Sequence, residues 1–245
     1  MGSFQVDILA IGAHPDDVEL GCGGMLIASV KQDKKVAIVD LTKGELGTRG
    51  TPEIRSEEAA AAAASMGIHF RENLGMEDGF FEITQENILK VIQAIRKYQP
   101  TIVVCNAPHD RHPDHQRASD LVVRACFLSG LHRVKTELDN VPQMHWRPAN
   151  VYHYLQDNYL EPDLLFDISG VIREKMDAVA AYKTQFNSPD RSEPQTYIST
   201  PDFVDKVKAR NLSFGKIIGV TYAEGLLSEK KIGIRNMDAL IHQTT

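Results

Sequence analysis

The chain has 245 residues, of which 42% are hydrophobic and 24% are charged. This composition is ordinary for a globular protein and excludes a chain that is mostly disordered. With 27 basic against 33 acidic residues, the net charge is −6. Nucleic acid is therefore not expected as a partner, because an acidic protein repels the phosphate backbone.

The number of cysteines and the length of the apolar runs indicate in which part of the cell the protein is expected. Cys22, Cys105 and Cys126 are too few and too far apart to form a disulfide framework, so a reduced, cytoplasmic protein is expected. The longest apolar stretches have the length of strands, so no membrane span is expected. The N-terminal region lacks a basic segment ahead of its apolar run and does not resemble a signal peptide.

The first half of the chain alternates apolar runs with helical patterns. A strand is expected over residues 6–12, followed by a glycine-rich turn at 21–24 that leads into a helix over 25–32. Thr51 and Pro52 have the residue types of a helix cap and a first helical position. The other elements expected here are a strand over 35–42, a helix over 52–66, a strand near 69–74, a helix capped by Thr84 and a strand over 101–105.

The second half is less regular. Helices are expected at about 114–129, 170–183 and 201–215, with strands near 151–155 and 164–168 and a polar loop over 187–200. Alternating helices and apolar strands predict an α/β, Rossmann-like fold with a mostly parallel sheet and helices on both faces. We expect a single domain over residues 1–245.

Imidazole and carboxylate groups follow two of the predicted strands. Residues 14–17 read His-Pro-Asp-Asp, and residues 112–115 read His-Pro-Asp-His. Either motif alone is compatible with a turn that caps a helix. Ligands in open parallel sheets bind beyond the carboxyl ends of the strands, so the two motifs are expected to converge there. Two such clusters favour a metal site.

These residue types predict the chemistry of the site. Imidazole together with carboxylate is typical of zinc or ferrous iron. His14, Asp17 and either His112 or His115 would supply the three protein ligands of a catalytic site. The groups left over would provide a carboxylate base and a cationic donor for an oxyanion, as a hydrolase requires.

Two other functions use the same ligand types. Two histidines and one carboxylate also form the triad of ferrous oxygenases, and a non-catalytic metal-binding or sugar-binding protein is a further alternative. The alternation of strand and helix and the spare carboxylate of Asp16 favour hydrolysis.

The two motifs carry a resemblance to a known family. Ala-His-Pro-Asp-Asp at 13–17, His-Pro-Asp-His at 112–115, the helix with Arg55 and Tyr-Ala-Glu-Gly at 222–225 resemble the PIG-L/LmbE family of zinc-dependent de-N-acetylases. Within the family, the chain is most similar to the N-acetylglucosaminyl-malate deacetylases of bacillithiol biosynthesis. The resemblance covers nearly the whole chain and implies a hydrolase of a small amino-sugar conjugate that assembles as a homo-oligomer.

The resemblance also implies roles for individual residues. Three positions match the family's Zn²⁺ ligands, a set that would also suit Fe²⁺: His14, Asp17 and His115. Asp16 falls on the general base, and His112 on a protonated residue that stabilises the oxyanion, with Asp114 orienting it. Some relatives carry a tyrosine two positions before this histidine, where the chain has Asp110.

Basic residues gather near the predicted site. A residue matching Arg55 lines the substrate pocket in relatives, and Arg111 adjoins the second motif. A planar guanidinium suits a carboxylate, so both are expected to bind a carboxylate-bearing substrate such as a malate conjugate. Lys43 and Arg49 are expected to be solvated. A membrane-bound substrate is not expected, because the chain shows no amphipathic membrane-binding stretch.

Overall fold

A seven-stranded sheet forms the centre of the computed structural model, which describes residues 4–186 and 193–240. The strand order is β3-β2-β1-β4-β7-β9-β8. The first five of these strands pair in parallel, whereas β9 is antiparallel to both of its neighbours. The strands are β1 (Ile8–Gly12), β2 (Val36–Thr42), β3 (Phe70–Met76), β4 (Ile102–Asn106), β7 (Asn150–Tyr154), β8 (Leu164–Asp167) and β9 (Ala223–Ser228).

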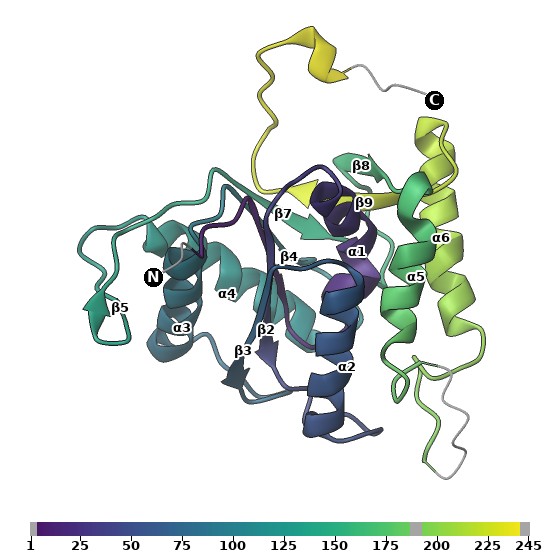
Figure 1. Ribbon diagram of the computed structural model, residues 1–245, viewed down its shortest axis with the longest axis horizontal. Coiled ribbons are helices and arrows are strands. Elements are labelled where there is room, and N and C mark those ends of the chain that lie inside the picture. Colours follow the sequence, from purple (N-terminus) through teal and green to yellow (C-terminus); the bar gives the residue numbers. More distant parts are fainter. Residues whose placement is uncertain (1–3, 187–192, 241–245) are drawn as a thin grey trace.

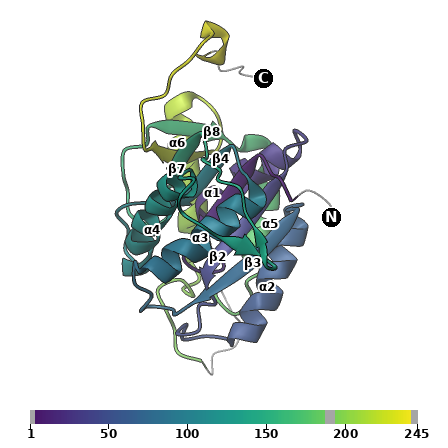
Figure 2. The same ribbon diagram turned by 90° about the vertical axis from the view of Figure 1, so that its left-hand side faces the viewer.

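Helices cover both faces of the sheet, which confirms the predicted fold (Figures 1 and 2). In Figure 1, α3 and α4 lie on one side of the strands, and α1, α2 and α5 lie on the other. The helix α6 packs against β8 and β9. The helices are α1 (Asp17–Val30), α2 (Pro52–Ser65), α3 (Gln85–Tyr98), α4 (Pro113–Ser129), α5 (Ile172–Ala180) and α6 (Phe203–Ile218). Shorter elements are β5 (Glu137–Leu138), β6 (Val141–Pro142) and the 3-10 helices at Ser169–Val171 and Met237–Leu240.

Alternating side chains of the central strand enter two different cores. Leu9 and Ile11 pack with residues of α3 and α4. Ile8 and Ala10 pack on the opposite face with residues of α1. A strand buried on both faces reads as an unbroken apolar run, which is why this strand could be recognised in the sequence. Among the described residues, no helix combines the length and the apolar character that crossing a bilayer requires.

The helix caps agree with the sequence, but the predicted glycine turn is wrong. The side chains of Thr51 and Thr84 accept hydrogen bonds from the amides that open α2 and α3. Residues 21–24 lie inside α1, which begins at Asp17. A Cβ on Gly21 would lie 2.1 Å from the ring of Tyr154, and one on Gly24 would lie 2.8 Å from Ile168. Glycine therefore lets α1 approach its neighbours closely, and this packing outweighs its low helix propensity.

The C-terminal strand β9 was not predicted, because a charged residue interrupts its apolar pattern. Glu224 is fully buried in it and pairs with the buried Lys175 at 2.6 Å. The carboxylate also accepts hydrogen bonds from the amides of Gly24 and Met25 in α1. Of the predicted loop over 187–200, residues 187–192 lie outside the described part, and the rest contains neither helix nor strand.

The strand order creates one switch point at the centre of the sheet. From β1 the chain proceeds outward through β2 and β3, then returns to add β4 on the other side of β1. The loops that follow β1 and β4 consequently diverge to opposite faces and leave a crevice at the carboxyl ends of these strands. Both histidine motifs occupy these two loops.

Candidate active site

The two motifs converge as predicted, and Asn106 at the end of β4 joins them. Its side-chain oxygen accepts a hydrogen bond from the amide of Ala13 at 2.9 Å. Its side-chain nitrogen donates to Oδ2 of Asp17 at 3.1 Å. One buried amide side chain thus holds the loop after β1 against the loop after β4.

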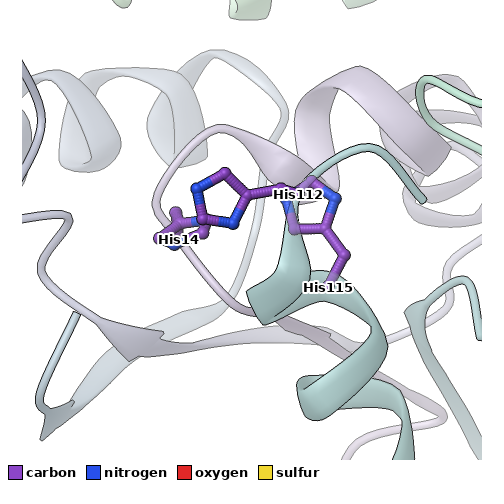
Figure 3. A group of neighbouring side chains, drawn as sticks. All are labelled: His14, His112 and His115. Carbon is purple, nitrogen blue, oxygen red and sulfur yellow. The ribbon is translucent and has the colours of Figure 1, made fainter. Parts of the chain in front are cut away.

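Three imidazoles gather in the crevice (Figure 3). The ring of His14, from the loop after β1, lies 4.7 Å from that of His112 and 5.6 Å from that of His115. His112 directly precedes α4, and His115 lies in its first turn. Each histidine offers a nitrogen atom, and the three nitrogens lie within 4.8 Å of one another. This is the spacing of groups that share one metal ion.

Asp17 lies between two of the imidazoles. Its Oδ2 is 3.4 Å from Nδ1 of His14, and its Oδ1 is 3.1 Å from Nε2 of His115. Burial raises the pKa of Asp17, but the neighbouring His115 and His14 outweigh burial and hold it well below its usual value. The structure therefore places the predicted ligand Asp17 in contact with both His14 and His115.

The other ring nitrogen of each of these two histidines faces a carboxylate. Nδ1 of His115 lies 2.7 Å from Oδ2 of Asp110. Nε2 of His14 lies 3.0 Å from Asp78 and 3.3 Å from Asp114. Metal-binding histidines commonly carry such a partner, which fixes the tautomer and the ring orientation. The residue types and contacts of His14, Asp17 and His115 thus suit a divalent metal, and their assignment as its ligands stays a prediction.

Two other groupings of ligand atoms share His14, and Asp17 belongs to neither of them. The sets His14, His112, His115 and His14, Asp78, Asp114 each bring three candidate ligand atoms within 4.8 Å. Among the described residues, no carboxylate is hydrogen-bonded to the ring of His112. Because Asp110 is such a carboxylate partner for His115, His115 is favoured over His112 as the third ligand.

Asp16 is a buried carboxylate in a strained backbone position beside the ligands. Its φ of 109° lies in a region that few residues other than glycine adopt, and the residue is 5% exposed. Burial raises the pKa of Asp16 to about 7, although the Arg55 guanidinium 3.1 Å away opposes the shift. A carboxylate with this pKa is poised to take up and release a proton near neutral pH.

Arg55 makes several contacts within the protein. Besides Asp16, its guanidinium donates to the carbonyl oxygens of Pro15 at 2.6 Å and Gly44 at 3.2 Å. The residue is only 6% exposed. These contacts hold Arg55 against Asp16, and its role in binding a substrate carboxylate stays a prediction.

His112 differs in two respects from the sequence-based expectation. Burial, together with the nearby His14 and His115, lowers the pKa of His112 to about 4, so its imidazole is neutral at pH 7. The backbone amide of Asp114, and not its carboxylate, bonds to Nδ1 of His112. The Asp114 carboxylate instead accepts hydrogen bonds from the Gly79 amide and from Arg117 and contacts His14.

The predicted metal ligands line a cleft of about 490 Å³. Arg111 lies on its wall, with its guanidinium 2.6 Å from Asp157 and stacked 4.3 Å above the ring of Tyr197. The side chain of Arg111 remains 45% exposed. Of the two arginines predicted to bind substrate, Arg111 is thus the one that the solvent reaches.

The sequence model described as "PIG-L: GlcNAc-PI de-N-acetylase" matches residues 9–126, which include both motifs. "Probable N-acetyl-alpha-D-glucosaminyl L-malate deacetylase 2" of Bacillus subtilis (strain 168) is 30% identical over 195 residues, covering 73% of this chain and 82% of that protein. The chain belongs to the PIG-L family. Another relative, the diacetylchitobiose deacetylase of Thermococcus kodakarensis, is 28% identical over 230 residues, covering 89% of this chain and 81% of that protein.

Solved structures share the fold of this chain. The conserved protein TT1542 from Thermus thermophilus superposes with a TM-score of 0.84 at 36% identity, covering 94% of this chain and 97% of that one. The 4-carboxy-2-hydroxymuconate hydratase GalB from Pseudomonas putida KT2440 reaches 0.76 at 20% identity, covering 95% and 99% of the two chains. That second likeness shows the fold alone, so the activity must be argued from the site.

The sequence reasoning missed several residues that shape this site. Asp110 lies within the second histidine segment, so its position offered a signal for a partner of His115. Asp78 follows β3, and Gln156, which donates to Asp17 at 2.8 Å, follows β7. Neither lies near a motif, and only the sheet order brings them to the crevice.

Proposed function

We propose that the protein is a metal-dependent N-deacetylase that removes the acetyl group from an N-acetylglucosamine conjugate. The observation that carries the proposal is the buried Asp16 carboxylate, with its pKa raised to about 7 by burial, beside the cluster of His14, Asp17 and His115. A base next to a three-ligand site is the arrangement that amide hydrolysis requires. The names of the family model and of the curated relatives support the same chemistry.

His14, Asp17 and His115 would hold the metal, for which we propose Zn²⁺. A bound zinc ion supplies a Lewis acid for the amide carbonyl and lowers the pKa of water toward neutrality. In the metal-free protein, burial opposes protonation of His115, but Asp17 and Asp110 raise its pKa to about 9. Metal binding must therefore displace protons from the ligands.

Asp16 acts as the general base. Its ionised form accepts a proton from the attacking water, and the resulting carboxylic acid returns the proton to the departing amine. Arg55 holds the carboxylate in position throughout, through the contact at 3.1 Å. The strained φ at Asp16 is the cost of aiming this carboxylate into the cleft beside the ligands.

His112 stabilises the oxyanion as a neutral imidazole. Its Nδ1 accepts the amide hydrogen of Asp114, so the ring proton resides on Nε2. Nε2 can then donate a hydrogen bond to the oxygen on which negative charge develops. The backbone of Asp114 sets the tautomer of His112, in place of the carboxylate that the sequence suggested.

We further propose that the substrate is N-acetylglucosaminyl-malate and that the enzyme serves bacillithiol biosynthesis. The Bacillus subtilis relative bears that substrate in its name. The half-exposed guanidinium of Arg111 on the cleft wall can bind a substrate carboxylate. The diacetylchitobiose deacetylase among the relatives makes a neutral disaccharide the competing substrate.

The test supplies the zinc-loaded protein with N-acetylglucosaminyl-malate, N,N′-diacetylchitobiose or free N-acetylglucosamine and measures acetate and primary amine. We expect equal amounts of both products, with the highest kcat/KM on the malate conjugate and no change when oxygen is removed. Binding without acetate release from any of the three would contradict the deacetylase. Equal kcat/KM on the malate conjugate and the free sugar would contradict the malate assignment alone.

A further inference from the structure

A second pocket, of about 330 Å³, adjoins the catalytic cleft. Much of its wall comes from α6, and we call it the α6 pocket. Six residues line both the cleft and the α6 pocket: Leu20, Arg111, His115, Gln156, Tyr197 and Ile198. Because His115 is among them, a substrate whose amide reaches the metal ligands has room to extend into the α6 pocket.

The wall of the α6 pocket is largely apolar. Phe203, Val207 and Phe214 of α6 contribute to it, and the ring of Tyr159 lies 6.2 Å from that of Phe214. Apolar walls exclude water and so strengthen any charge interaction made between them. A polar ligand that enters this space must therefore find a specific partner.

The charges on this wall are mainly positive. Arg111, Lys206 and Arg210 line the pocket, and Asp157 is the sole carboxylate residue among its described lining residues. Arg111 pairs with Asp157 at 2.6 Å. Lys206 pairs with Asp202 at 2.7 Å on the exposed surface. Arg111 and Lys206 thus each have a carboxylate partner within the protein, and Arg111 is exposed enough to contact a substrate carboxylate as well.

Arg210 is the exception. Its Nη2 donates to the carbonyl oxygen of Leu20 at 2.8 Å, and within the described residues no carboxylate lies within ion-pair distance of its guanidinium. Its Nε is buried and has no hydrogen-bond partner there. Burial lowers the pKa of Arg210, which shows that the surroundings do not fully offset the loss of water. A cation left in this state is stabilised by an incoming anion.

We propose that the α6 pocket receives the aglycone of the conjugate and that Arg210 binds a carboxylate on it. The inference rests on the proposed deacetylase function and adds where the non-sugar part is recognised. The guanidinium keeps N–H groups that the protein does not use, and a small dicarboxylic aglycone would supply both the anion and a short apolar chain. A neutral second sugar would leave Arg210 unpaired.

The test compares the zinc-loaded wild type with Arg210→Gln and Arg210→Lys on two substrates. One is N-acetylglucosaminyl-malate, and the other is methyl N-acetyl-α-D-glucosaminide, which lacks a carboxylate. Lys216→Gln removes one charge from an exposed position on the same helix and serves as the control. Binding of α-glucosyl-malate and methyl α-glucoside, which contain no amide, is measured in parallel by calorimetry.

We expect Arg210→Gln to lower the preference for the malate conjugate about 10- to 100-fold, mainly through KM, because a hydrogen bond to a charged group is lost. Arg210→Lys should restore part of the preference, and Lys216→Gln should not change it. Calorimetry should show weaker binding of α-glucosyl-malate to Arg210→Gln. Equal losses on both substrates, an unchanged preference, or no binding of α-glucosyl-malate to the wild type would overturn the pocket assignment. Failure of the wild type to release acetate from either substrate would instead overturn the deacetylase, and the calorimetry would still decide the pocket.

Discussion

The catalytic cleft and the α6 pocket meet at Arg111 and Tyr197, but their charges are satisfied in different ways. In the cleft, Asp16 pairs with Arg55, and both oxygens of Asp17 have hydrogen-bonding partners. In the α6 pocket, the guanidinium of Arg210 has no carboxylate partner among the described residues. The first region is organised before substrate arrives, whereas the second leaves a charge for the ligand to neutralise.

This difference between the cleft and the α6 pocket corresponds to two tasks of an enzyme, catalysis and substrate selection. Groups that act on the reacting atoms must be preorganised, because rearranging them during the reaction would raise the barrier. A group that selects the substrate gains specificity by remaining unpaired until the correct ligand binds. The cleft residues of the two motifs lie within the matched residues 9–126, whereas α6 lies beyond them. The two regions can therefore be altered separately.

The largest effect is expected from removing a metal ligand. His115→Ala should lose most of the bound zinc and nearly all activity on every substrate, because Asp17 also loses its partner at 3.1 Å. The loss of metal affinity should exceed the roughly 10- to 100-fold loss that is expected when a residue hydrogen-bonded to a metal ligand is removed. Elemental analysis after dialysis measures the zinc content. Full occupancy in this variant would remove His115 from the ligand set.

The next largest effect concerns the base. Asp16→Asn should retain zinc and lower kcat by about 10²- to 10⁴-fold, because the proton acceptor is lost. Asparagine tolerates positive φ, so the backbone should be preserved. Asp33→Asn replaces another aspartate at positive φ, 61°, on an exposed turn and is the matched control.

The pH profile of the wild type tests the same assignment. The base must be ionised, and the pKa of Asp16 is about 7 because burial raises it. kcat/KM should therefore rise with pH through about 7 and level off above it. Wild-type turnover by Asp16→Asn would contradict this mechanism.

An intermediate effect is expected from changing Asp110, the carboxylate that contacts the predicted ligand His115. Asp110→Asn should weaken zinc affinity roughly 10- to 100-fold, because Nδ1 of His115 loses its carboxylate at 2.7 Å. Turnover at saturating zinc should decline less than the affinity does. Asp120→Asn, at an exposed position of α4, is the control. Unchanged zinc affinity in Asp110→Asn would show that His115 does not depend on this contact for metal binding.

The parallel part of the fold could be predicted because its strands are buried on both faces. The runs at β1, β2 and β4 are apolar enough to be recognised without any knowledge of their neighbours. The failures have a common cause in long-range packing. Position 21 is glycine although it lies inside a helix, because the ring of Tyr154 leaves no room for a Cβ. Strand β9 tolerates Glu224 because Lys175 is buried beside it. Neither partner lies near these positions in the sequence.

The candidate site, like the fold, contains residues that could be predicted from the sequence and residues that could not. His14, Asp16 and Asp17 are contiguous or nearly so, and short motifs of this kind can be recognised without a structure. Asp78 reaches the site only through the sheet order, and Arg210 lines the adjoining α6 pocket only through the packing of α6. The ion pair between Arg55 and Asp16 was not predicted either, because it depends on how the loop after β1 packs against α2.

The smallest effect should come from Arg55, and it separates the two arginines. Arg55 opposes the shift that burial imposes on the pKa of Asp16, so Arg55→Gln should raise that pKa above about 7. Loss of an adjacent opposite charge commonly changes a carboxyl pKa by about one unit or more. At pH 7 the ionised fraction of Asp16 would then fall about fivefold, and near pH 9 the difference from wild type should almost vanish.

This loss should be equal on N-acetylglucosaminyl-malate and on its methyl glycoside counterpart, because Arg55 acts through the base that both substrates share. Arg210→Gln should do the reverse and change the preference between the substrates without moving the pH profile. kcat/KM measured from pH 5.5 to 9.5 on both substrates therefore distinguishes a positioning residue from a specificity residue. If Arg55→Gln instead lowered the malate preference at every pH and left the profile in place, Arg55 would bind the substrate carboxylate after all. The contrast between the catalytic cleft, whose charges are paired within the protein, and the α6 pocket, whose Arg210 awaits an anion, would then be wrong. The substrate carboxylate would bind in the cleft where the amide is hydrolysed.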